Sequence, residues 1–258
     1  MYFEVFSGIV SSYWLLILLF FVIAVLYSSV GFGGGSGYLA VLVLSGIAYT
    51  QIRSTALLCN IAVVTGNVFL CYRRGIYRWK KVLPLVFFSV PLSFLGGFLK
   101  ISESLFFILL GFTLLFASVL MWISKHVVRQ KSDIKKTSII KNVSYGGVIG
   151  FFSGMVGIGG GIFLAPLLHF THWDFPKKIA ATASLFILVN SVSGLGGQYF
   201  NPNFEIDWWL TLILLITVFL GGQIGSRLSH RFFSPILLKR ITAILIAFVS
   251  VQILKTHL

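Results

Sequence analysis

The sequence is poor in charged residues, and acidic residues are especially scarce. Only 10% of the 258 residues are charged, with 6 Asp and Glu against 20 Lys and Arg, whereas 57% are hydrophobic. Soluble domains carry roughly 25% charged residues, because their surfaces face water. A soluble fold cannot bury this much apolar surface, so we predict one membrane domain with no separate soluble domain.

Cysteine is also scarce, and motifs for catalysis or cofactor binding are lacking. Cys59 and Cys71 lie in one apolar segment, without the spacing of a zinc site or of a disulfide framework. The phosphate-binding pattern GxxxxGK[ST] is absent, and no nucleophile and base form a catalytic constellation. His169 and His172, beside Trp173, are more typical of a membrane interface than of a metal site. We therefore expect no enzyme activity, no metal, no cofactor and no use of ATP.

The uneven charge restricts the partners of the protein. In a soluble protein, a net charge of +14 would favour nucleic-acid binding. Here Lys and Arg lie in short loops between apolar runs, where they orient a membrane protein, so we expect no nucleic acid. The acidic residues all fall in loops or tails of the predicted structure. Proton pumps and cation transporters usually carry carboxylates inside the membrane, so a cationic substrate is disfavoured.

Long apolar segments dominate the rest of the chain. Seven of them have about the 20 residues that a helix needs to cross the hydrocarbon core. Two further regions, 36–44 and 145–169, are short or interrupted by glycine, as re-entrant or discontinuous helices are. We therefore predict an all-α polytopic membrane protein. The seven segments are residues 13–30, 53–71, 82–99, 104–123, 179–198, 208–226 and 235–254.

The two halves of the sequence resemble each other. We infer two repeats, residues 1–123 and 144–258, joined by a basic linker at 124–143. The matches keep their order along the chain and their offset drifts only slightly, which chance seldom produces. The matched pairs are GFGGG at 31–35 with GIGGG at 157–161, Thr55 with Thr182, Trp79 with Trp208, and Gly96 with Gly225.

The positions of Lys and Arg predict the orientation of the repeats. If each glycine-rich region forms a hairpin that enters and leaves on one side, three spans remain in each repeat and the repeats are inverted. All Lys and Arg except Arg53, Lys100 and Lys255 then lie inside, as the positive-inside rule requires. We expect a multi-pass protein of the plasma membrane, the inner membrane of a bacterium. The linker is expected in the cytoplasm and both termini outside.

The glycine-rich regions are candidate binding sites. Consecutive glycines let the backbone adopt positive φ and bring N–H groups close to a ligand. Helices beginning at about Ser36 and about Ile162 would present unpaired N–H donors and about half a positive charge each. In inverted repeats, both helix starts would face one central site and bind an anion. The alternative is that these glycines only permit close helix packing.

Polar side chains follow each glycine-rich region on the next apolar segment. Such side chains must face protein or water. Thr55, Asn60, Thr182 and Asn190 recur at similar places, and we expect a shared pocket, although hydrogen bonds between helices would also explain them. Arg53 would supply charge for an anion, or would extend to the membrane interface. The candidate substrate-binding residues are Gly33, Gly34, Gly35, Ser36, Arg53, Thr55, Asn60, Gly159, Gly160, Gly161, Thr182, Ser184 and Asn190.

The glycine motifs resemble those of the TauE/SafE family of sulfite exporters, membrane transporters of sulfur-containing anions. The second repeat fits well, with GIGGG at 157–161, then Pro166, and AATAS at 180–184. The first repeat carries Ala40 where that proline would align, so the two half-sites would be unequal. The resemblance covers essentially the whole chain. It implies transport of sulfite, thiosulfate or small organosulfonates without a bound cofactor.

We therefore predict a secondary transporter, working in the direction of export, that moves a small sulfur-containing anion by alternating access. An anion channel or facilitator remains an alternative, as does a membrane scaffold without transport activity. The expected partners are the small anion and the lipid bilayer, and a homodimer is left open.

Overall fold

The structure is a computed structural model that describes residues 2–30, 32–123, 138–202, 204–228 and 235–257. The described residues form ten helices and no strand, which confirms the all-α prediction. Most of the predicted linker, 124–137, lies outside the described residues. The helices are α1 (Tyr2–Val30), α2 (Gly35–Leu44), α3 (Tyr49–Arg73), α4 (Trp79–Phe98), α5 (Glu103–Ile123), α6 (Ile139–Val156), α7 (Gly161–Phe170), α8 (Pro176–Tyr199), α9 (Trp208–Leu228) and α10 (Pro235–His257).

Seven of the described helices are long and apolar enough to cross a membrane, which confirms a multi-pass membrane protein. Six of these, in α1, α3, α4, α5, α8 and α9, coincide with predicted segments, and the seventh is α6. The described apolar part of α10, Thr242–His257, is shorter than a span. Large hydrophobic side chains such as Phe87, Trp208 and Phe248 are exposed, as expected for a surface that faces lipid.

The glycine-rich regions break the helices, close to where the sequence predicted. The short helices α2 and α7 begin one residue before the predicted starts at Ser36 and Ile162. The residues just before them adopt left-handed backbone angles, which only glycine takes without steric cost. The φ angles are +89° at Gly34, +90° at Gly157, +81° at Gly159 and +79° at Gly160.

The second break turns the chain back toward the end of the bundle at which α6 begins. Trp173, which follows α7, donates a 3.1 Å hydrogen bond from Nε1 to Oδ1 of Asn142 at the start of α6. The pair α6 and α7 therefore enters and leaves the bundle at one end, which we call the Trp173 end. This end also holds the connection between α3 and α4, because Lys81 donates a hydrogen bond to the carbonyl oxygen of Trp173 over 2.6 Å.

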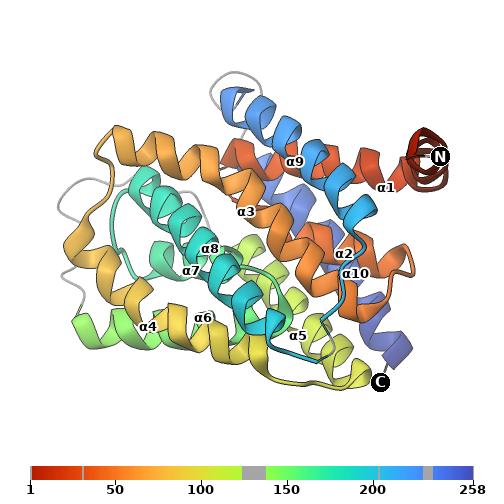
Figure 1. The fold of residues 1–258 in the computed structure, drawn as a ribbon. Coiled ribbons are helices and arrows are strands. Elements are labelled where there is room, and N and C mark those ends of the chain that lie inside the picture. Colours follow the sequence, from red (N-terminus) through yellow and green to blue (C-terminus); the bar gives the residue numbers. More distant parts are fainter. Residues whose placement is uncertain (1, 31, 124–137, 203, 229–234, 258) are drawn as a thin grey trace.

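The opposite end, which we call the Arg53 end, contains the start of α3 and the connections that follow α4 and α8. Asn201 donates hydrogen bonds of 3.2 Å to the carbonyl oxygens of Phe98 and Leu99. Thr50 donates a 2.8 Å hydrogen bond to the Glu205 carboxylate. Figure 1 shows that α1 begins and α10 ends on this side, at the right of the picture.

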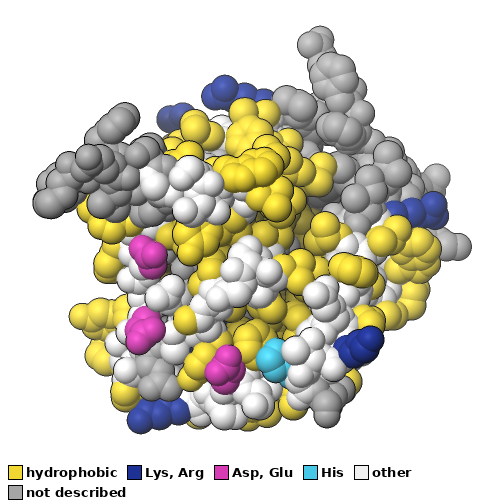
Figure 2. Space-filling view, turned by 90° about the vertical axis from the view of Figure 1, so that its right-hand side faces the viewer, with side chains coloured by type: hydrophobic (Ala, Val, Ile, Leu, Met, Phe, Trp, Pro, Cys, Tyr) yellow, Lys and Arg dark blue, Asp and Glu magenta, His cyan; other side chains and the backbone are white. Residues whose placement is uncertain are grey.

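The two ends differ in charge. At the Trp173 end, Arg78 and Lys81 lie 3.1 Å and 3.7 Å from Asp174. The predicted basic loops 72–81 and 171–178 therefore meet at the same end. Figure 2 faces the right-hand side of Figure 1, and there acidic side chains lie within the face while Lys and Arg lie toward its margin.

Helices of the first half pack on helices of the second. The main contacts join α4 with α6, α1 with α9, α5 with α10, α4 with α8, α3 with α8, and α3 with α9. Exchanging α1–α5 for α6–α10 leaves this set of contacts unchanged. At Gly96 a Cβ would overlap the carbonyl oxygen of Phe151, and at Gly225 it would overlap that of Val25. The two glycines that align in sequence thus occupy equivalent helix crossings.

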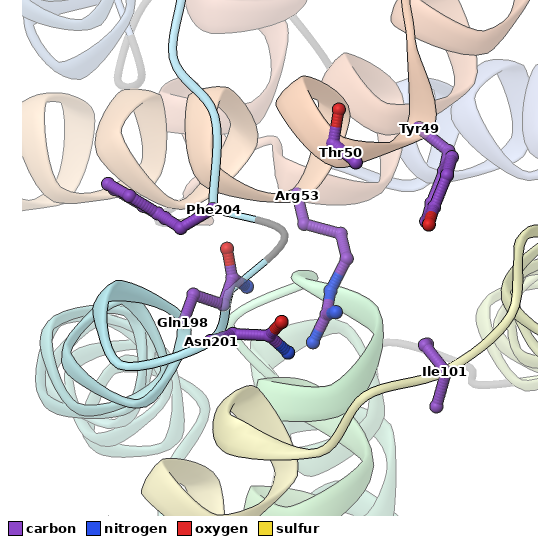
Figure 3. Close-up of a pocket in the computed structure, with 7 residues that line it drawn as sticks. All are labelled: Tyr49, Thr50, Arg53, Ile101, Gln198, Asn201 and Phe204. Atoms are coloured by element: carbon purple, nitrogen blue, oxygen red, sulfur yellow. The ribbon is translucent and has the colours of Figure 1, made fainter.

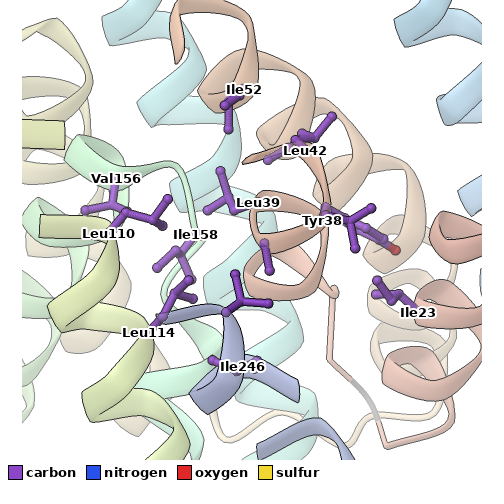
Figure 4. Close-up of a cluster of buried hydrophobic side chains, with 14 of the residues drawn as sticks. Ile23, Tyr38, Leu39, Leu42, Ile52, Leu110, Leu114, Val156, Ile158 and Ile246 are labelled. Atoms are coloured by element: carbon purple, nitrogen blue, oxygen red, sulfur yellow. The ribbon is translucent and has the colours of Figure 1, made fainter. Parts of the chain in front are cut away.

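The short helix α2 is enclosed by its neighbours. Its residues from Gly35 to Leu42 are buried. Figure 4 shows Tyr38, Leu39 and Leu42 among side chains of α1, α3, α5 and α10 and of the second break. This apolar packing holds the start of α2 inside the bundle and so positions the first break.

Candidate functional site

The starts of α2 and α7 meet at one small cavity in the interior. Its lining includes Gly33–Ser36 of the first break, Ile158 and Gly161 of the second break, and Asn60 of α3. The cavity has a volume of about 10 Å³, which is room for about one water molecule. The structure therefore brings together the predicted residues Gly33, Gly34, Gly35, Ser36, Asn60 and Gly161.

The first residues of both helices line this cavity. The first intrahelical bond of α2 runs from the N–H of Tyr38 to the carbonyl of Gly34, and that of α7 runs from Phe163 to Gly160. Among the described residues, no side chain caps either start. The N–H groups of the first residues therefore have no intrahelical acceptor, and each start carries about half a positive charge.

Asn60 lies between the two breaks. Its Nδ2 donates a 3.0 Å hydrogen bond to the carbonyl oxygen of Ile158, and its Oδ1 has no hydrogen-bond partner among the described residues. A Cβ at Gly33 would lie 2.7 Å from this Oδ1, and one at Gly35 would overlap Nδ2. Glycine is therefore required at these positions for the amide to fit between the breaks.

Helix α8 places an apolar residue opposite Asn60. Ile187 of α8 contacts Gly33 and Gly159 as Asn60 does, so it occupies the equivalent place. Ser191, one turn further along α8, would lie 2.9 Å from a Cβ at Gly159. The site is thus polar on the α3 side and partly apolar on the α8 side.

Asn190, which the sequence paired with Asn60, lies away from the cavity. Its Nδ2 donates hydrogen bonds to Oγ of Ser89 over 3.0 Å and to the carbonyl oxygen of Phe186 over 2.8 Å. It therefore joins α8 to α4. Asn190 lies about one helical turn further along α8 than the position equivalent to Asn60, which the similar sequence context of the two asparagines does not reveal.

The other predicted polar residues also make contacts between or within helices. Thr55 pairs with Thr211 of α9 at 3.2 Å, and Thr182 donates to the carbonyl oxygen of Lys178 over 2.8 Å. Ser184 accepts a 2.8 Å hydrogen bond from Asn67. Thr55, Thr182, Asn60 and Asn190 therefore do not share one pocket in the described structure. The predicted site residue Gly160 lies next to Phe186 and Ile149, and Asn60 is not among its nearest neighbours.

Arg53 is buried rather than extended to the membrane interface. Only 6% of its surface is exposed, and Nη2 lies 3.4–3.5 Å from the carbonyl oxygens of Gly96, Gly97 and Gly154. These carbonyls belong to the last turns of α4 and α6, which carry partial negative charge. Two helix ends therefore stabilise the guanidinium, and the described ion pairs do not include it.

A second cavity surrounds Arg53 at its end of the bundle. Figure 3 shows the Arg53 side chain extending from α3 toward Gln198 and Asn201, with Tyr49 on the far side. Gln198 is 3% exposed, and its Nε2 has no hydrogen-bond partner among the described residues. The sequence analysis missed Gln198 and Asn201, because both lie at the end of an apolar segment where polar residues are common.

The Trp173 end is closed by buried polar contacts. The Asp174 side chain is fully buried and faces both Arg78 and Lys81. The Lys81 ammonium also lies 5.0 Å from the centre of the Trp173 ring, which is itself fully buried. Because α4, α6 and the connection after α7 all take part, this cluster fastens three elements together.

The interior thus offers hydrogen-bond donors and positive charge. In the part of the chain that the structure describes, no three His, Cys, Asp or Glu side chains lie together so as to hold a metal ion. The donors are the helix starts, the amide of Gln198 and the guanidinium of Arg53. This chemistry suits the binding of an anion.

The comparisons with known proteins agree with the fold. The family described as sulfite exporter TauE/SafE matches residues 16–253. The "Probable membrane transporter protein y4hK" of Sinorhizobium fredii is 32% identical over 93% of this chain and 97% of its own length. A "Probable membrane transporter protein" of Methanocaldococcus jannaschii is 22% identical over 84% of this chain and 86% of its own. No solved structure matches. The chain therefore belongs to the sulfite exporter TauE/SafE family of membrane transporters.

Proposed function

We propose that this protein is a secondary transporter that exports sulfite or a related small sulfur-containing anion, such as thiosulfate or an organosulfonate. The observation that carries the proposal is the meeting of two uncapped helix starts at one interior cavity. Their N–H groups and partial positive charges favour an anion, and no ATP-binding motif is present. The family supports the class of substrate.

The proposed binding residues are those of the breaks and of the polar interior around them. Backbone N–H groups at Gly35, Ser36 and Gly161 would donate to the anion oxygens, with Asn60 beside them. Arg53 would contribute positive charge from the Arg53 end. Thr55, Thr182, Ser184 and Asn190 would support the helices that hold the site, since their contacts join or brace α3, α4, α8 and α9.

The proposed mechanism is alternating access between two inverted repeats, residues 1–123 and 144–258. The pattern of helix contacts is unchanged when α1–α5 are exchanged for α6–α10, and this supports the repeat. The hairpin of α6 and α7, which enters and leaves at one end, leaves the three spans that inversion needs. A sulfite ion has four non-hydrogen atoms, whereas the central cavity has room for about one water molecule. The helices around the breaks must therefore separate for the anion to bind and leave.

The proposed placement is the bacterial inner membrane, with the linker 124–143 in the cytoplasm and both termini outside. The gathering of basic residues at the Trp173 end supports this orientation, because cytoplasmic loops carry an excess of Lys and Arg. The α10 terminus then lies at the opposite end, as Figure 1 shows.

The test is flux of labelled sulfite in proteoliposomes. Replacing Gly35 with Ala places a Cβ on Asn60 Nδ2 and on the Ile158 carbonyl oxygen, and we expect flux to fall at least about tenfold. Asn60→Ala removes the amide without adding bulk and should also lower flux. Gly8→Ala is the control, because a Cβ there meets nothing within 4 Å.

The alternatives predict different results. Wild-type flux from both folded variants would contradict the role of the breaks. A channel would give flux that does not saturate and no exchange with unlabelled anion on the far side. A scaffold would give no flux and no anion-dependent change in melting temperature.

A further inference from the structure

Two polar stripes face each other along the seam between α3 and α8. Each stripe consists of three polar residues of one helix. Neighbouring members of a stripe are seven positions apart in sequence, which is about two turns, or roughly 10 Å along one face. The helices pack directly on each other. The stripes consist of Arg53, Asn60 and Asn67 in α3 and of Ser184, Ser191 and Gln198 in α8.

The stripes pair in antiparallel order. At the Arg53 end, Arg53 and Gln198 line the same cavity. Toward the Trp173 end, Asn67 donates a 2.8 Å hydrogen bond to Oγ of Ser184. The polar pairs therefore follow the full length of the seam from one end of the bundle toward the other.

The middle pair lies at the breaks. A Cβ at Gly159 would lie 2.9 Å from both Asn60 Nδ2 and Ser191 Oγ, so both side chains approach the second break. Asn60 also lines the cavity between the two helix starts. The proposed binding site for the anion is therefore the central point of the seam.

Small cavities accompany all three pairs. The cavity at Arg53 has a volume of about 20 Å³, the central one about 10 Å³, and the one lined by Asn67 and Ser184 about 10 Å³. Phe32 lines both of the last two. Protein interiors are otherwise densely packed. The seam is thus a line of small spaces that crosses the bundle.

Several polar atoms along the seam are unsatisfied. They are buried and have no hydrogen-bond partner among the described residues, whereas native proteins pair the large majority of such atoms. Since both donors and acceptors are left open on facing helices, a solvated ligand would find partners from the Arg53 end to the middle of the seam. The atoms are Arg53 Nε, Asn60 Oδ1, Ser191 Oγ and Gln198 Nε2.

The chemistry at the Arg53 end favours an oxyanion. Arg53 and Gln198 each contribute an unpaired N–H donor to the lining of one cavity. The carboxylate of Glu205 accepts a hydrogen bond from Thr50, and the described ion pairs leave Arg53 without an acidic partner. A guanidinium beside an amide donor matches an anion with two or more oxygen atoms.

We propose that the α3–α8 seam is the route of the anion through the protein, and that Arg53 and Gln198 bind a small sulfur oxyanion at one end of it. This proposal rests on the proposed function and adds a second binding site about two helical turns from the breaks. The anion exchanges between this site and the breaks along the facing polar side chains.

The binding site is tested with Gln198→Glu. The new carboxylate lines the same cavity as the Arg53 guanidinium, and we expect it to take the place of the anion. The apparent affinity for sulfite and for methanesulfonate, measured by the ligand-induced shift in melting temperature, should fall at least about tenfold. Gln198→Leu removes the donor without adding charge and should weaken binding less. Gln252→Glu, on an exposed part of α10, is the matched control.

The route is tested at its other end with Asn67→Leu. The leucine fills the space beside Ser184, so we expect sulfite flux in proteoliposomes to fall at least about tenfold while the ligand-induced shift is retained. Thr65→Leu changes an exposed residue of the same helix and should leave both unchanged. Size-exclusion profiles and melting temperatures show that each variant is folded.

The outcomes separate the two proposals. If wild-type protein shows neither flux nor a shift with either anion, the proposed function fails. If wild-type protein shows both, and Gln198→Glu binds as tightly as wild type, the site at Arg53 is refuted. If Asn67→Leu and Thr65→Leu carry equal flux, the seam is not the route.

Discussion

Asp174 fastens the Trp173 end of the bundle, and replacing it with asparagine should loosen that end. The side chain is fully buried, and it faces the Arg78 guanidinium at 3.1 Å and the Lys81 ammonium at 3.7 Å. Asn keeps the shape and can still accept the 2.9 Å hydrogen bond from the Phe175 N–H. The substitution therefore removes the charge alone.

The expected loss of stability depends on how exposed the two basic partners of Asp174 are. Removing one member of a fully buried ion pair costs about 3–5 kcal/mol. Arg78 and Lys81 are 39% and 23% exposed, so water compensates part of the loss, and we expect a cost of about 2 kcal/mol for opening this end. Because 1.4 kcal/mol corresponds to a factor of ten, the open population should increase more than about tenfold.

Cys71 is a natural reporter of this opening. It is 8% exposed and packs against Tyr77 and Ala181 at the Trp173 end. Alkylation of the thiol by a maleimide therefore requires local opening, and its rate follows the open population. In a Cys59→Ala background, which removes the other cysteine, we expect Asp174→Asn to raise the rate by about tenfold or more.

The control acts at the opposite end of the bundle. Asp207 accepts hydrogen bonds from the N–H groups of Trp209 and Leu210 and so caps α9. Asp207→Asn removes a charge from that end and should leave the alkylation of Cys71 unchanged. Equal rates in the Asp174→Asn variant and its background protein would refute the reasoning that this ionic cluster holds the end closed.

Two further predictions concern the packing of the helices. Gly154→Ala places a Cβ on the carbonyl oxygen of Ser93 at the α4–α6 crossing, so the melting temperature should fall, with a cost in stability of about 1–3 kcal/mol. Val148→Ala, an exposed change on α6, is the control. An unchanged melting temperature for Gly154→Ala would contradict the close crossing. Trp173→Phe removes the 3.1 Å hydrogen bond to Asn142 and part of the indole packing. It should lower the melting temperature and raise the alkylation rate of Cys71. A stable, unreactive variant would show that this bond does not fasten α6.

The helices and the breaks could be predicted from sequence because both depend on local chemistry. A run of about 20 apolar residues has few alternatives to a membrane helix. The glycines before Gly35 and Gly161 mark the breaks within one residue, since left-handed backbone angles such as those of Gly34 and Gly160 strongly favour glycine. The region 145–169 was ambiguous because α6 is rich in glycine, which lowers its hydropathy although the helix is long enough to span.

The polar side chains were predicted less well, because their partners come from distant segments. Asn60 and Asn190 look alike in sequence, yet Ile187 is the residue that faces the breaks from α8. Arg53 lies near a segment end, where an arginine usually reaches water. Its burial depends on carbonyl groups of α4 and α6, which are 43 or more residues away.

The seam between α3 and α8 combines a feature that is visible in the sequence with one that only the tertiary structure decides. The seven-residue spacing of Arg53, Asn60 and Asn67 is visible in the sequence and by itself places the three on one helix face. Which helix that face meets, and in which direction, is decided by tertiary packing, since a stripe on one helix fits many partners.

The sequence alone determined that this protein is a bundle of membrane helices with two glycine breaks, because hydropathy and backbone freedom are properties of short segments. Only the tertiary structure decided that both helix starts meet beside Asn60, that Arg53 turns inward, and that Asp174 closes the opposite end. The physical reason is that electrostatic and hydrogen-bond partners are chosen by proximity in space, which the order of residues along the chain does not specify.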